Sequence, residues 1–322
     1  MKPKLRVFFT DFWKDFNCNE NYFIDTLKKN YEIIIDGKNP ELLIFSYLGK
    51  EFLNYPKCIK IFYTGENIRP SYWESDYSLS FDYPTYGGRN FRLPLYVLYG
   101  ANEALLKPKN GREILAEKSK FCNFVVSNPI CKKRNEFFQL LNKVKHVDSG
   151  GKLYNNIGYL IENKLDFIKD YRFSIAFENS SFEGYTTEKI FEPMKVNSIP
   201  IYWGNSLIKK DFNAKSFINV HDFSTLQECV NYIVSLDDNT AELEKILNEP
   251  WFHNNQIPEY FEQDNLLSFF DHILKVEADF NPNSFQQAIR RAKGNISYES
   301  KVWIKETKLF IDKVSRFYHK LR

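Results

Sequence analysis

The chain has 322 residues, of which 43% are hydrophobic and 26% are charged. This length suits two domains of moderate size, and the composition allows a sizeable buried core and excludes wholesale disorder. The formal net charge of +3 is too small to indicate a nucleic-acid-binding protein by itself.

The sequence shows no signal peptide, membrane span or disulfide framework. The apolar run near the N-terminus is too short for a signal peptide and stops at Asp11, and no stretch approaches the roughly 20 apolar residues that span a membrane. The five cysteines are odd in number and no pair has the C-x-x-C spacing, so we expect buried free thiols. We therefore expect a cytoplasmic protein.

The first third of the chain alternates short apolar runs with polar helical stretches. A helix is expected at 21–29, with Phe23, Ile24 and Leu27 on one face. Strands are expected at 5–9, 32–35, 42–45 and 58–63. Such alternation favours an α/β layer with a mainly parallel sheet.

Residues 100–117 lose this pattern, and a second α/β series follows them. Its expected strands are 121–127, 173–177, 199–203 and 216–220, and its expected helices are 132–142, 225–236 and 240–247. We therefore predict a first domain at 1–118, a second at 119–270 and a C-terminal helical segment at 271–322.

The last segment, 298–322, is a strong helix candidate with a basic surplus. An apolar stripe runs along it, made of Trp303, Phe310, Val314, Phe317 and Leu321. From residue 301 onward it holds seven Lys or Arg and two Asp or Glu. Two interpretations stay open: peripheral attachment to the anionic inner face of the cell membrane, or packing on the body with a solvated basic face.

A buried strand in the second domain leads into a polar segment. The strand at 173–177 delivers Glu178 and Asn179 to the carboxyl edge of a sheet, where ligands bind in open α/β folds. Gly184 then allows an unusual turn before the next helix. These features place a candidate ligand site at this edge.

The helix that follows is expected to present a positive amino end. Thr186 and Thr187 are candidate N-caps, and the first turn carries Glu188 and Lys189. Free backbone N–H groups at a helix N-terminus suit an anion such as a diphosphate. Pro193 is expected to break or bend the helix early. Taken alone, these features fit either a phosphate site or an ordinary capped helix.

Several stretches of this sequence together resemble a known enzyme family. The main motifs are Phe177-Glu178-Asn179-Ser180, Gly184-Tyr185-Thr186-Thr187-Glu188-Lys189-Ile190 and Ile199-Pro200-Ile201-Tyr202-Trp203-Gly204. Further stretches are Phe62-Tyr63-Thr64-Gly65-Glu66-Asn67-Ile68, Val126-Ser127-Asn128-Pro129 with Arg134-Asn135, Asp148-Ser149-Gly150-Gly151 and Asn155-Asn156-Ile157-Gly158. Running in order from about residue 58 to 223, they resemble the α-1,3/4-fucosyltransferases of bacterial type, glycosyltransferase family ten.

The resemblance implies the GT-B fold, in which two Rossmann-like domains face each other across a cleft. It implies that GDP-fucose binds mainly to the second domain. It also implies inverting transfer of fucose to a glycan, such as N-acetylglucosamine in a lactosamine unit. The stretch before about residue 55 carries no motif of the family, so the natural acceptor and the linkage position stay open.

The resemblance also implies residue roles. Glu66 matches the family's proposed general base, for which the ordinary alternative is a surface or N-capping Glu. Arg134 and Lys189 match basic residues that hold the donor diphosphate; they are otherwise a helix-surface Arg and a surface Lys. Such cations would stabilise the charge that grows on the leaving GDP.

Three further residues match the family's donor site. Glu188 matches an acid that contacts hydroxyls of the donor sugar. Asn179 and Tyr185 match residues of the donor cleft, and their ordinary alternatives are turn formation and core packing.

No metal or other cofactor is expected, since GDP-fucose is a co-substrate. Transferases of the other main fold bind Mn²⁺ through an Asp-x-Asp pair. The tight pair Asp237-Asp238 lacks that spacing, and we interpret it as a solvated helix end. Basic residues take the place of the metal ion in this interpretation.

Two other functions remain open on the sequence. One is a transferase of the same fold with another nucleotide sugar, and the other is a non-catalytic glycan- or nucleotide-binding module on a degenerate scaffold. Retention of Glu66, Arg134 and Lys189 argues against the second. A nucleic-acid partner is discounted, because it would rest only on the basic tail and the aromatic residues.

Overall fold

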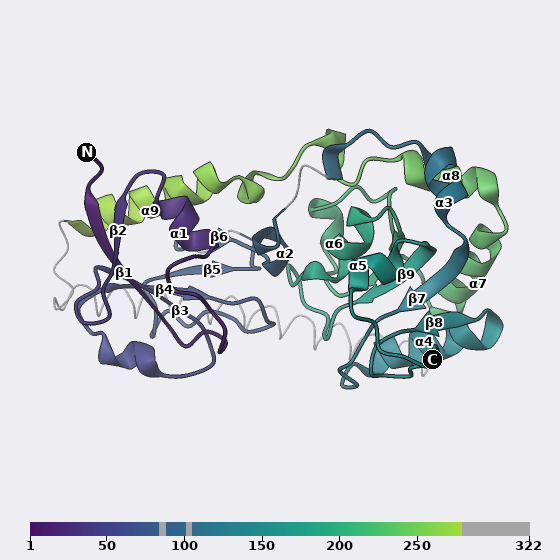
Figure 1. Cartoon of the computed structure of the whole chain (residues 1–322), viewed down its shortest axis with the longest axis horizontal. Coiled ribbons are helices and arrows are strands. Elements are labelled where there is room, and N and C mark those ends of the chain that lie inside the picture. Colours follow the sequence, from purple (N-terminus) through teal and green to yellow (C-terminus); the bar gives the residue numbers. More distant parts are fainter. Residues whose placement is uncertain (84–87, 101–104, 279–322) are drawn as a thin grey trace, which may run out of the picture. The chain divides into compact units, whose positions relative to one another are not determined.

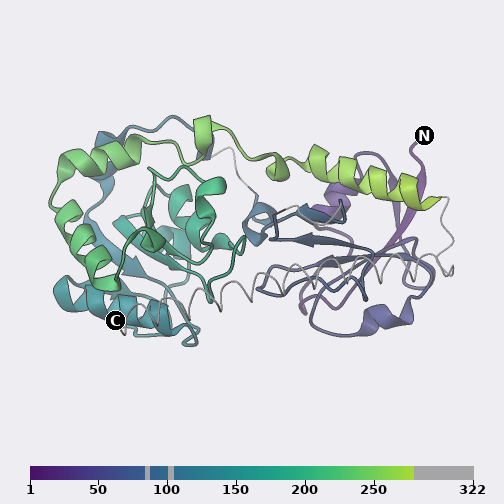
Figure 2. The same cartoon turned by 180° about the vertical axis from the view of Figure 1, so that it is seen from behind.

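The computed structural model describes residues 1–83, 88–100 and 105–278. The chain divides into two compact α/β units, each built on its own sheet, as seen in Figure 1 and from behind in Figure 2. Of the described residues, the first unit holds 1–64, 68–83, 88–92 and 263–278. The second holds 65–67, 93–100 and 105–262.

The first unit is built on a six-stranded parallel sheet with the order β2-β1-β3-β4-β5-β6. The strands are β1 (Lys4–Thr10), β2 (Glu32–Ile35), β3 (Leu42–Phe45), β4 (Ile59–Tyr63), β5 (Tyr77–Ser80) and β6 (Asn90–Arg92). Helix α1 (Tyr22–Leu27) buries Phe23, Ile24 and Leu27, the face that the sequence predicts. Helix α9 (Gln263–Ala278) lies beside α1 in both cartoons, so the described chain returns to the first unit.

The second unit is built on a five-stranded parallel sheet with the order β11-β10-β9-β7-β8. Its strands are β7 (Lys120–Phe124), β8 (Val147–Ser149), β9 (Tyr171–Phe177), β10 (Ile199–Trp203) and β11 (Ile218–Asn219). Its helices are α2 (Leu95–Leu98), α3 (Gly111–Glu117), α4 (Lys132–Val144), α5 (Lys164–Ile168), α6 (Glu188–Lys195), α7 (Leu226–Asp237) and α8 (Thr240–Asn248). Short 3₁₀ turns lie at Glu51–Asn54, Ile208–Lys210, Val220–Asp222, His253–Asn255 and Glu259–Phe261.

Strand β9 is buried on both faces, as its apolar sequence predicts. Phe173, Ile175 and Phe177 join the core that α4, α7 and α8 complete. Helix α6 contacts β9 and β10. The strand therefore holds its carboxyl end, and the polar residues that follow, in a fixed position.

The structure adds a helix within 100–117, where the sequence analysis expects irregular chain. Asn110 caps α3 by accepting a hydrogen bond from the backbone N–H of Glu113. The N–H of Gly111 donates to Asn248 Oδ1 at 2.7 Å, and α3 packs on α8. Residues 93–100 and 105–118 lie in the second unit, whereas the sequence analysis assigns them to the first domain.

Strands β2, β3 and β10 have the expected bounds, whereas β5, β6 and β8 are short strands that periodicity does not reveal. Four of the five cysteines are buried, Cys18 is half-buried and all are free, as expected. The expected basic helix at 298–322 lies outside the described residues. Within them, no helix has both the length and the apolar character needed to span a bilayer.

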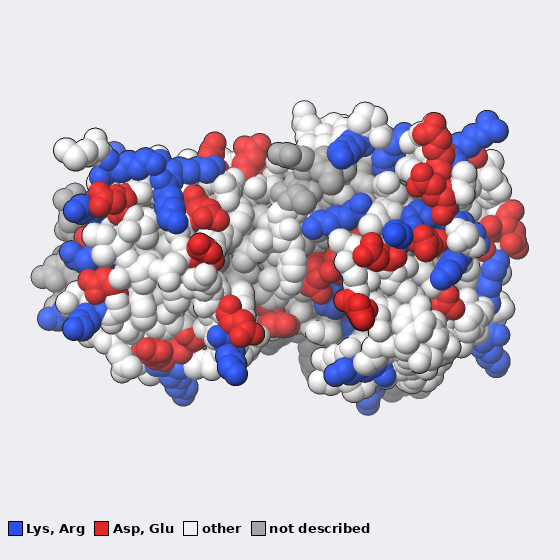
Figure 3. Space-filling view, in the orientation of Figure 1, with Lys and Arg blue, Asp and Glu red and all other residues white. Residues whose placement is uncertain are grey.

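The described surface carries both signs of charge. On the face drawn in Figure 3, Lys and Arg are interspersed with Asp and Glu over both units. That pattern agrees with the small net charge of the whole chain.

Candidate functional site

The strand order of the second unit reverses between β7 and β9, because β8 follows on one side and β10 on the other. Ligands of open α/β sheets bind beyond the carboxyl ends of the strands at such a point. Arg134, in the first turn of α4, bridges the two strand ends. It donates from Nη2 to the carbonyl of Asn128 at 2.6 Å and from Nη1 to that of Phe177 at 3.3 Å.

Arg134 is fully buried, which excludes the interpretation as a helix-surface residue. Its Nη1 also donates to Asn179 Oδ1 at 2.9 Å, so its three hydrogen-bond acceptors are all neutral oxygens. Burial lowers the pKa of Arg134, and Nε has no hydrogen-bond partner among the described residues. The guanidinium therefore links the loops after β7 and β9 by hydrogen bonds. It places a buried positive charge where the strand order reverses.

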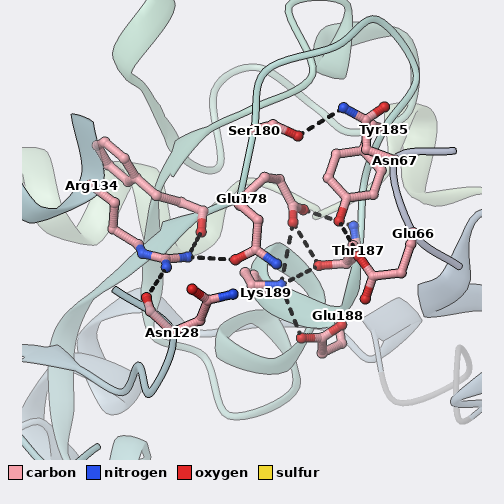
Figure 4. Close-up of polar contacts among 12 residues, drawn as sticks. Glu66, Asn67, Asn128, Arg134, Glu178, Ser180, Tyr185, Thr187, Glu188 and Lys189 are labelled. Atoms are coloured by element: carbon pink, nitrogen blue, oxygen red, sulfur yellow. Dashed lines mark hydrogen bonds and ion pairs between the residues drawn. The ribbon is translucent and has the colours of Figure 1, made fainter. Parts of the chain in front are cut away.

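The amino end of α6 is occupied by a carboxylate of the chain itself. Glu178 accepts from the backbone N–H of Thr187 at Oε1 and from the Thr187 hydroxyl at Oε2, both at 2.7 Å (Figure 4). Thr187 takes the N-cap position, but its side chain makes no cap bond to the helix. The predicted N-cap position of Thr187 is confirmed, but the Thr187 hydroxyl donates to Glu178 instead of capping the helix itself.

Lys189 lies between two carboxylates. Its Nζ is 3.4 Å from Glu178 Oε2 and 3.3 Å from Glu188 Oε1, and it donates to Thr187 Oγ1 at 2.9 Å. The side chains of Lys189 and Glu188 are 20% and 21% exposed, so Lys189 is more enclosed than a surface lysine. The pair therefore borders solvent, whereas Glu178 is sealed beneath it.

The carboxylates and the lysine shift each other's pKa values. Although burial opposes the change, Glu178 and Glu188 raise the pKa of Lys189. Burial acts to raise the pKa of Glu188, but the charges of Lys189 and Lys164 outweigh burial, so the pKa of Glu188 is lowered. Burial raises the pKa of Glu178, despite the nearby Lys189. Of the two carboxylates, Glu178 therefore holds a proton more readily.

Gly204 makes room for Glu178. A Cβ at residue 204 would lie 2.4 Å from Glu178 Cγ and 2.8 Å from Glu178 Cβ. Ser181 Oγ donates to the carbonyl of Gly204 at 2.6 Å, which fixes the backbone there. Gly204, the last residue of the motif at 199–204, therefore leaves the space that the Glu178 side chain of the motif at 177–180 occupies.

Glu66 is joined to the loop before α6 through Tyr185. The Tyr185 hydroxyl donates to Glu66 Oε2 at 3.2 Å, and Asn67 Nδ2 donates to Ser180 Oγ at 2.7 Å (Figure 4). Tyr185 is buried and Glu66 is exposed. Burial, followed by the charges of Glu178 and Glu66, raises the pKa of Tyr185, so its hydroxyl stays a donor. All six predicted site residues thus belong to the second unit, with Glu66 in its 65–67 segment.

Two local predictions are corrected. Helix α6 runs through Pro193 and ends at Lys195, so the expected break at Pro193 is wrong, because a proline so near the C-terminus removes only one late hydrogen bond. The expected bend stays a prediction. Asp237 is not a solvated helix end. Its side chain is 2% exposed and pairs with Arg172 and Lys145, whereas Asp238 is 76% exposed.

Sequence reasoning assigns no role to Glu178, Gly204 or the carbonyl of Asn128. Glu178 and Gly204 lie inside the motifs and directly follow buried strands, which is a usable signal. The Asn128 contact is made by a backbone atom, to which side-chain identity gives no clue. Among the described residues, no group of three or more His, Cys, Asp or Glu side chains is placed to hold a metal ion.

Two family descriptions match the chain. Residues 7–99 match "Alpha-(1,3)-fucosyltransferase FucT N-terminal domain", and residues 115–272 match "Glycosyltransferase family 10 (fucosyltransferase) C-term". The Helicobacter pylori alpha-(1,3)-fucosyltransferase FucT is 32% identical over 330 residues, covering 88% of this chain and 68% of that protein. A putative fucosyltransferase of Acanthamoeba polyphaga mimivirus is 29% identical over 70% of this chain and 39% of its own length.

Solved structures agree with these sequence matches. A crystal structure of alpha1,3-fucosyltransferase with GDP-fucose superposes with a TM-score of 0.73 at 28% identity, covering 85% of this chain and 91% of that one. A structure of the enzyme with GDP gives a TM-score of 0.74 at the same identity. The fold is thus α/β of the GT-B type, with one parallel sheet in each unit. The chain belongs to glycosyltransferase family 10, the fucosyltransferases.

Proposed function

We propose that this chain is an inverting α-1,3-fucosyltransferase that transfers L-fucose from GDP-fucose to N-acetylglucosamine in a lactosamine-type glycan. Family membership supports fucosyl transfer, and the names of the bacterial relative and of the superposed crystal structure support the α-1,3 linkage. The donor rests on the GDP-fucose in that crystal structure and on the site geometry.

The observation that carries the proposal is the hydrogen bond between Tyr185 and Glu66. Inversion in a single displacement requires a base that accepts the proton of the acceptor hydroxyl. Glu66 is an exposed carboxylate, and Tyr185 joins it to the motif that carries Lys189. In this proposal Glu66 is the general base, and Tyr185 orients it and borders the donor.

The leaving diphosphate needs positive charge that is already in place. Lys189 lies at the solvent border of the site and is proposed to contact the diphosphate directly. Arg134 supplies a buried positive charge. Its hydrogen bond to Asn179 also positions the loop after β9. Glu188, one fifth exposed, is proposed to accept hydrogen bonds from hydroxyls of the donor sugar.

No step in this mechanism requires a metal ion, because Lys189 and Arg134 would offset the charge on the diphosphate. We expect transfer to persist after treatment with EDTA. A rate that falls to background with EDTA and returns with added Mn²⁺ or Mg²⁺ would contradict this part of the proposal.

The test is GDP release from GDP-fucose with and without N-acetyllactosamine, with the product identified by mass spectrometry. We expect acceptor-stimulated release and a product that carries fucose on N-acetylglucosamine. A panel of GDP-mannose, UDP-galactose and GDP-fucose separates this function from that of a transferase with another donor. Faster transfer from another nucleotide sugar would replace the proposed donor.

A further inference from the structure

The charges around the proposed diphosphate site cancel before any donor arrives. Lys189 and Arg134 contribute two positive charges, and Glu178 and Glu188 contribute two negative charges when ionised. A nucleoside diphosphate sugar is an anion, so it would enter a site without net attraction and meet a buried carboxylate. Protonation of one carboxylate would give the site a net positive charge for the donor.

Glu178 is the carboxylate whose surroundings favour such a change. Its side chain has no exposed surface, so its charge is not screened by water. It competes directly with a diphosphate for both groups that would bind it, the amino end of α6 and the Lys189 ammonium. Bringing further negative charge to Lys189 would leave Glu178 as a buried anion with a weakened partner.

The groups that face Glu178 come from every side of the site. Helix α6 contributes Lys189 and Glu188, and the loop before it contributes the Thr187 hydroxyl and the Tyr185 ring. Strand β10 contributes Tyr202, and α4 contributes Arg134. Burial raises the pKa of Tyr185 and that of Tyr202, so both phenols stay neutral. Glu188 has a lowered pKa and borders solvent, which makes Glu178 the better proton acceptor.

We propose that Glu178 is a positioning residue of the donor site, and that its carboxylate takes up one proton from solvent when the donor diphosphate binds at Lys189. In the free protein the ionised carboxylate holds Lys189 and the start of α6 in place. In the donor complex the neutral acid keeps its hydrogen bonds but no longer competes for the ammonium. The inference rests on the proposed function, since it assumes a diphosphate at Lys189.

The hydrogen-bond geometry has a place for the proton. The backbone N–H of Thr187 can only donate, so Glu178 Oε1 remains an acceptor. The Thr187 hydroxyl, now a donor to Oε2, can rotate and accept instead. The new O–H bond therefore forms on Oε2, with its proton taken from the buffer and returned when the nucleotide leaves.

Isothermal titration calorimetry measures this proton directly. The full chain is titrated with GDP-fucose, without acceptor, in HEPES and in Tris at the same pH and ionic strength. GDP-fucose is preferred to GDP, because the terminal phosphate of GDP has its own ionisation near pH 6 (roughly, for a phosphate monoester). We expect the binding enthalpies in the two buffers to differ. Divided by the difference between the buffers' ionisation enthalpies, this difference should correspond to a net uptake of up to one proton for each donor bound.

The affinity gives a second readout with a definite sign. Binding that takes up a proton weakens as pH rises, here by up to about tenfold per pH unit. In Glu178→Gln the uptake should vanish and the affinity should no longer depend on pH. Glu192→Gln is the matched control, because Glu192 lies on α6 but pairs with Lys164; it should keep both the uptake and the pH dependence.

The outcomes separate this inference from the proposed function. If wild-type protein binds GDP-fucose without proton uptake, the inference is overturned and the function stands. Proton uptake that persists in Glu178→Gln would assign the proton to another group, and this result would also overturn the inference. Failure of wild-type protein to bind GDP-fucose would overturn the donor assignment and the inference together. If the Gln variant does not fold, the wild-type titration alone still shows whether donor binding takes up a proton.

Discussion

The hydroxyl of Tyr185 donates a hydrogen bond to Glu66, with 3.2 Å between Tyr185 Oη and Glu66 Oε2. This bond joins the short segment 65–67 to the loop that leads into α6. It brings the proposed base and the proposed diphosphate site into one compact unit.

Tyr185→Phe tests whether that bond orients the base. A hydrogen bond to a charged group is worth about 1.5–3 kcal/mol, so we expect kcat to fall by roughly 10- to 100-fold. GDP affinity should change little, because the ring stays in place. Tyr232→Phe, on a partly exposed ring of α7 that contacts Phe223, is the control and should leave kcat unchanged. An unaltered kcat in Tyr185→Phe would remove the orienting role.

Lys189→Ala should weaken GDP binding. Loss of one charge-assisted contact predicts an increase in Kd of roughly 10- to 100-fold, measured by calorimetry. Lys195→Ala on the same helix is the control, because Lys195 lies in the last turn of α6 and its Nζ donates to the Tyr99 carbonyl at 3.5 Å. Equal Kd values for the two variants would show that the diphosphate does not use Lys189.

Gly204→Ala should disturb the site without touching substrate. The added Cβ would lie 2.4 Å from Glu178 Cγ, so Glu178 or the backbone must move. We expect a loss of about 1–3 kcal/mol in the free energy of unfolding and weaker GDP binding. Gly158→Ala, where a Cβ meets nothing within 4 Å, is the control for an added methyl group that makes no close contact. Wild-type stability in Gly204→Ala would show that the close approach is unimportant.

The buried Lys109 should make the free energy of unfolding depend on pH. Its Nζ lies 3.4 Å from the centre of the Trp251 ring and has no hydrogen-bond partner among the described residues. Burial, partly offset by Glu249, lowers the pKa of Lys109 from 10.5 to about 7. Between these values the unfolded chain binds more protons than the folded chain, so the free energy of unfolding should rise with pH.

The variant Lys109→Met should remove much of that rise and be more stable than wild type near pH 7, by about 1 kcal/mol or more. Denaturant unfolding across this pH range measures both effects. Lys107→Met, at an exposed position, is the control and should follow the wild-type curve. A parallel rise in Lys109→Met would assign the pH dependence to other groups.

The sequence predicts the parts of the fold in which periodicity and burial coincide. Strands β9 and β10 are largely apolar and almost fully buried, and such segments are visible without a structure. Strand β8 has only three residues, and its edge is completed by the Asn156 side chain, which donates to the Val147 carbonyl at 2.8 Å. Pairing of that kind leaves no periodic signal.

The same limit applies to the site. Motif matching named Lys189 and Glu188 because charged residues at a helix start are conspicuous. It could not foresee that Glu178 occupies the helix amino end, since this depends on space left by Gly204, directly after β10. The pair Asp237-Asp238 shows the reverse error: only the fold brings Arg172 and Lys145 to Asp237 and buries it.

Transfer of fucose with Glu66 as the base is tested by comparing wild type with Glu66→Gln. Transfer of labelled fucose from GDP-fucose to N-acetyllactosamine is followed for wild type and Glu66→Gln, with the GDP affinity of both measured in parallel. We predict transfer by wild type, a decrease of roughly 10²- to 10⁴-fold in kcat for the variant, and an unchanged GDP Kd. A Glu66→Gln variant that transfers fucose at the wild-type rate would contradict the account.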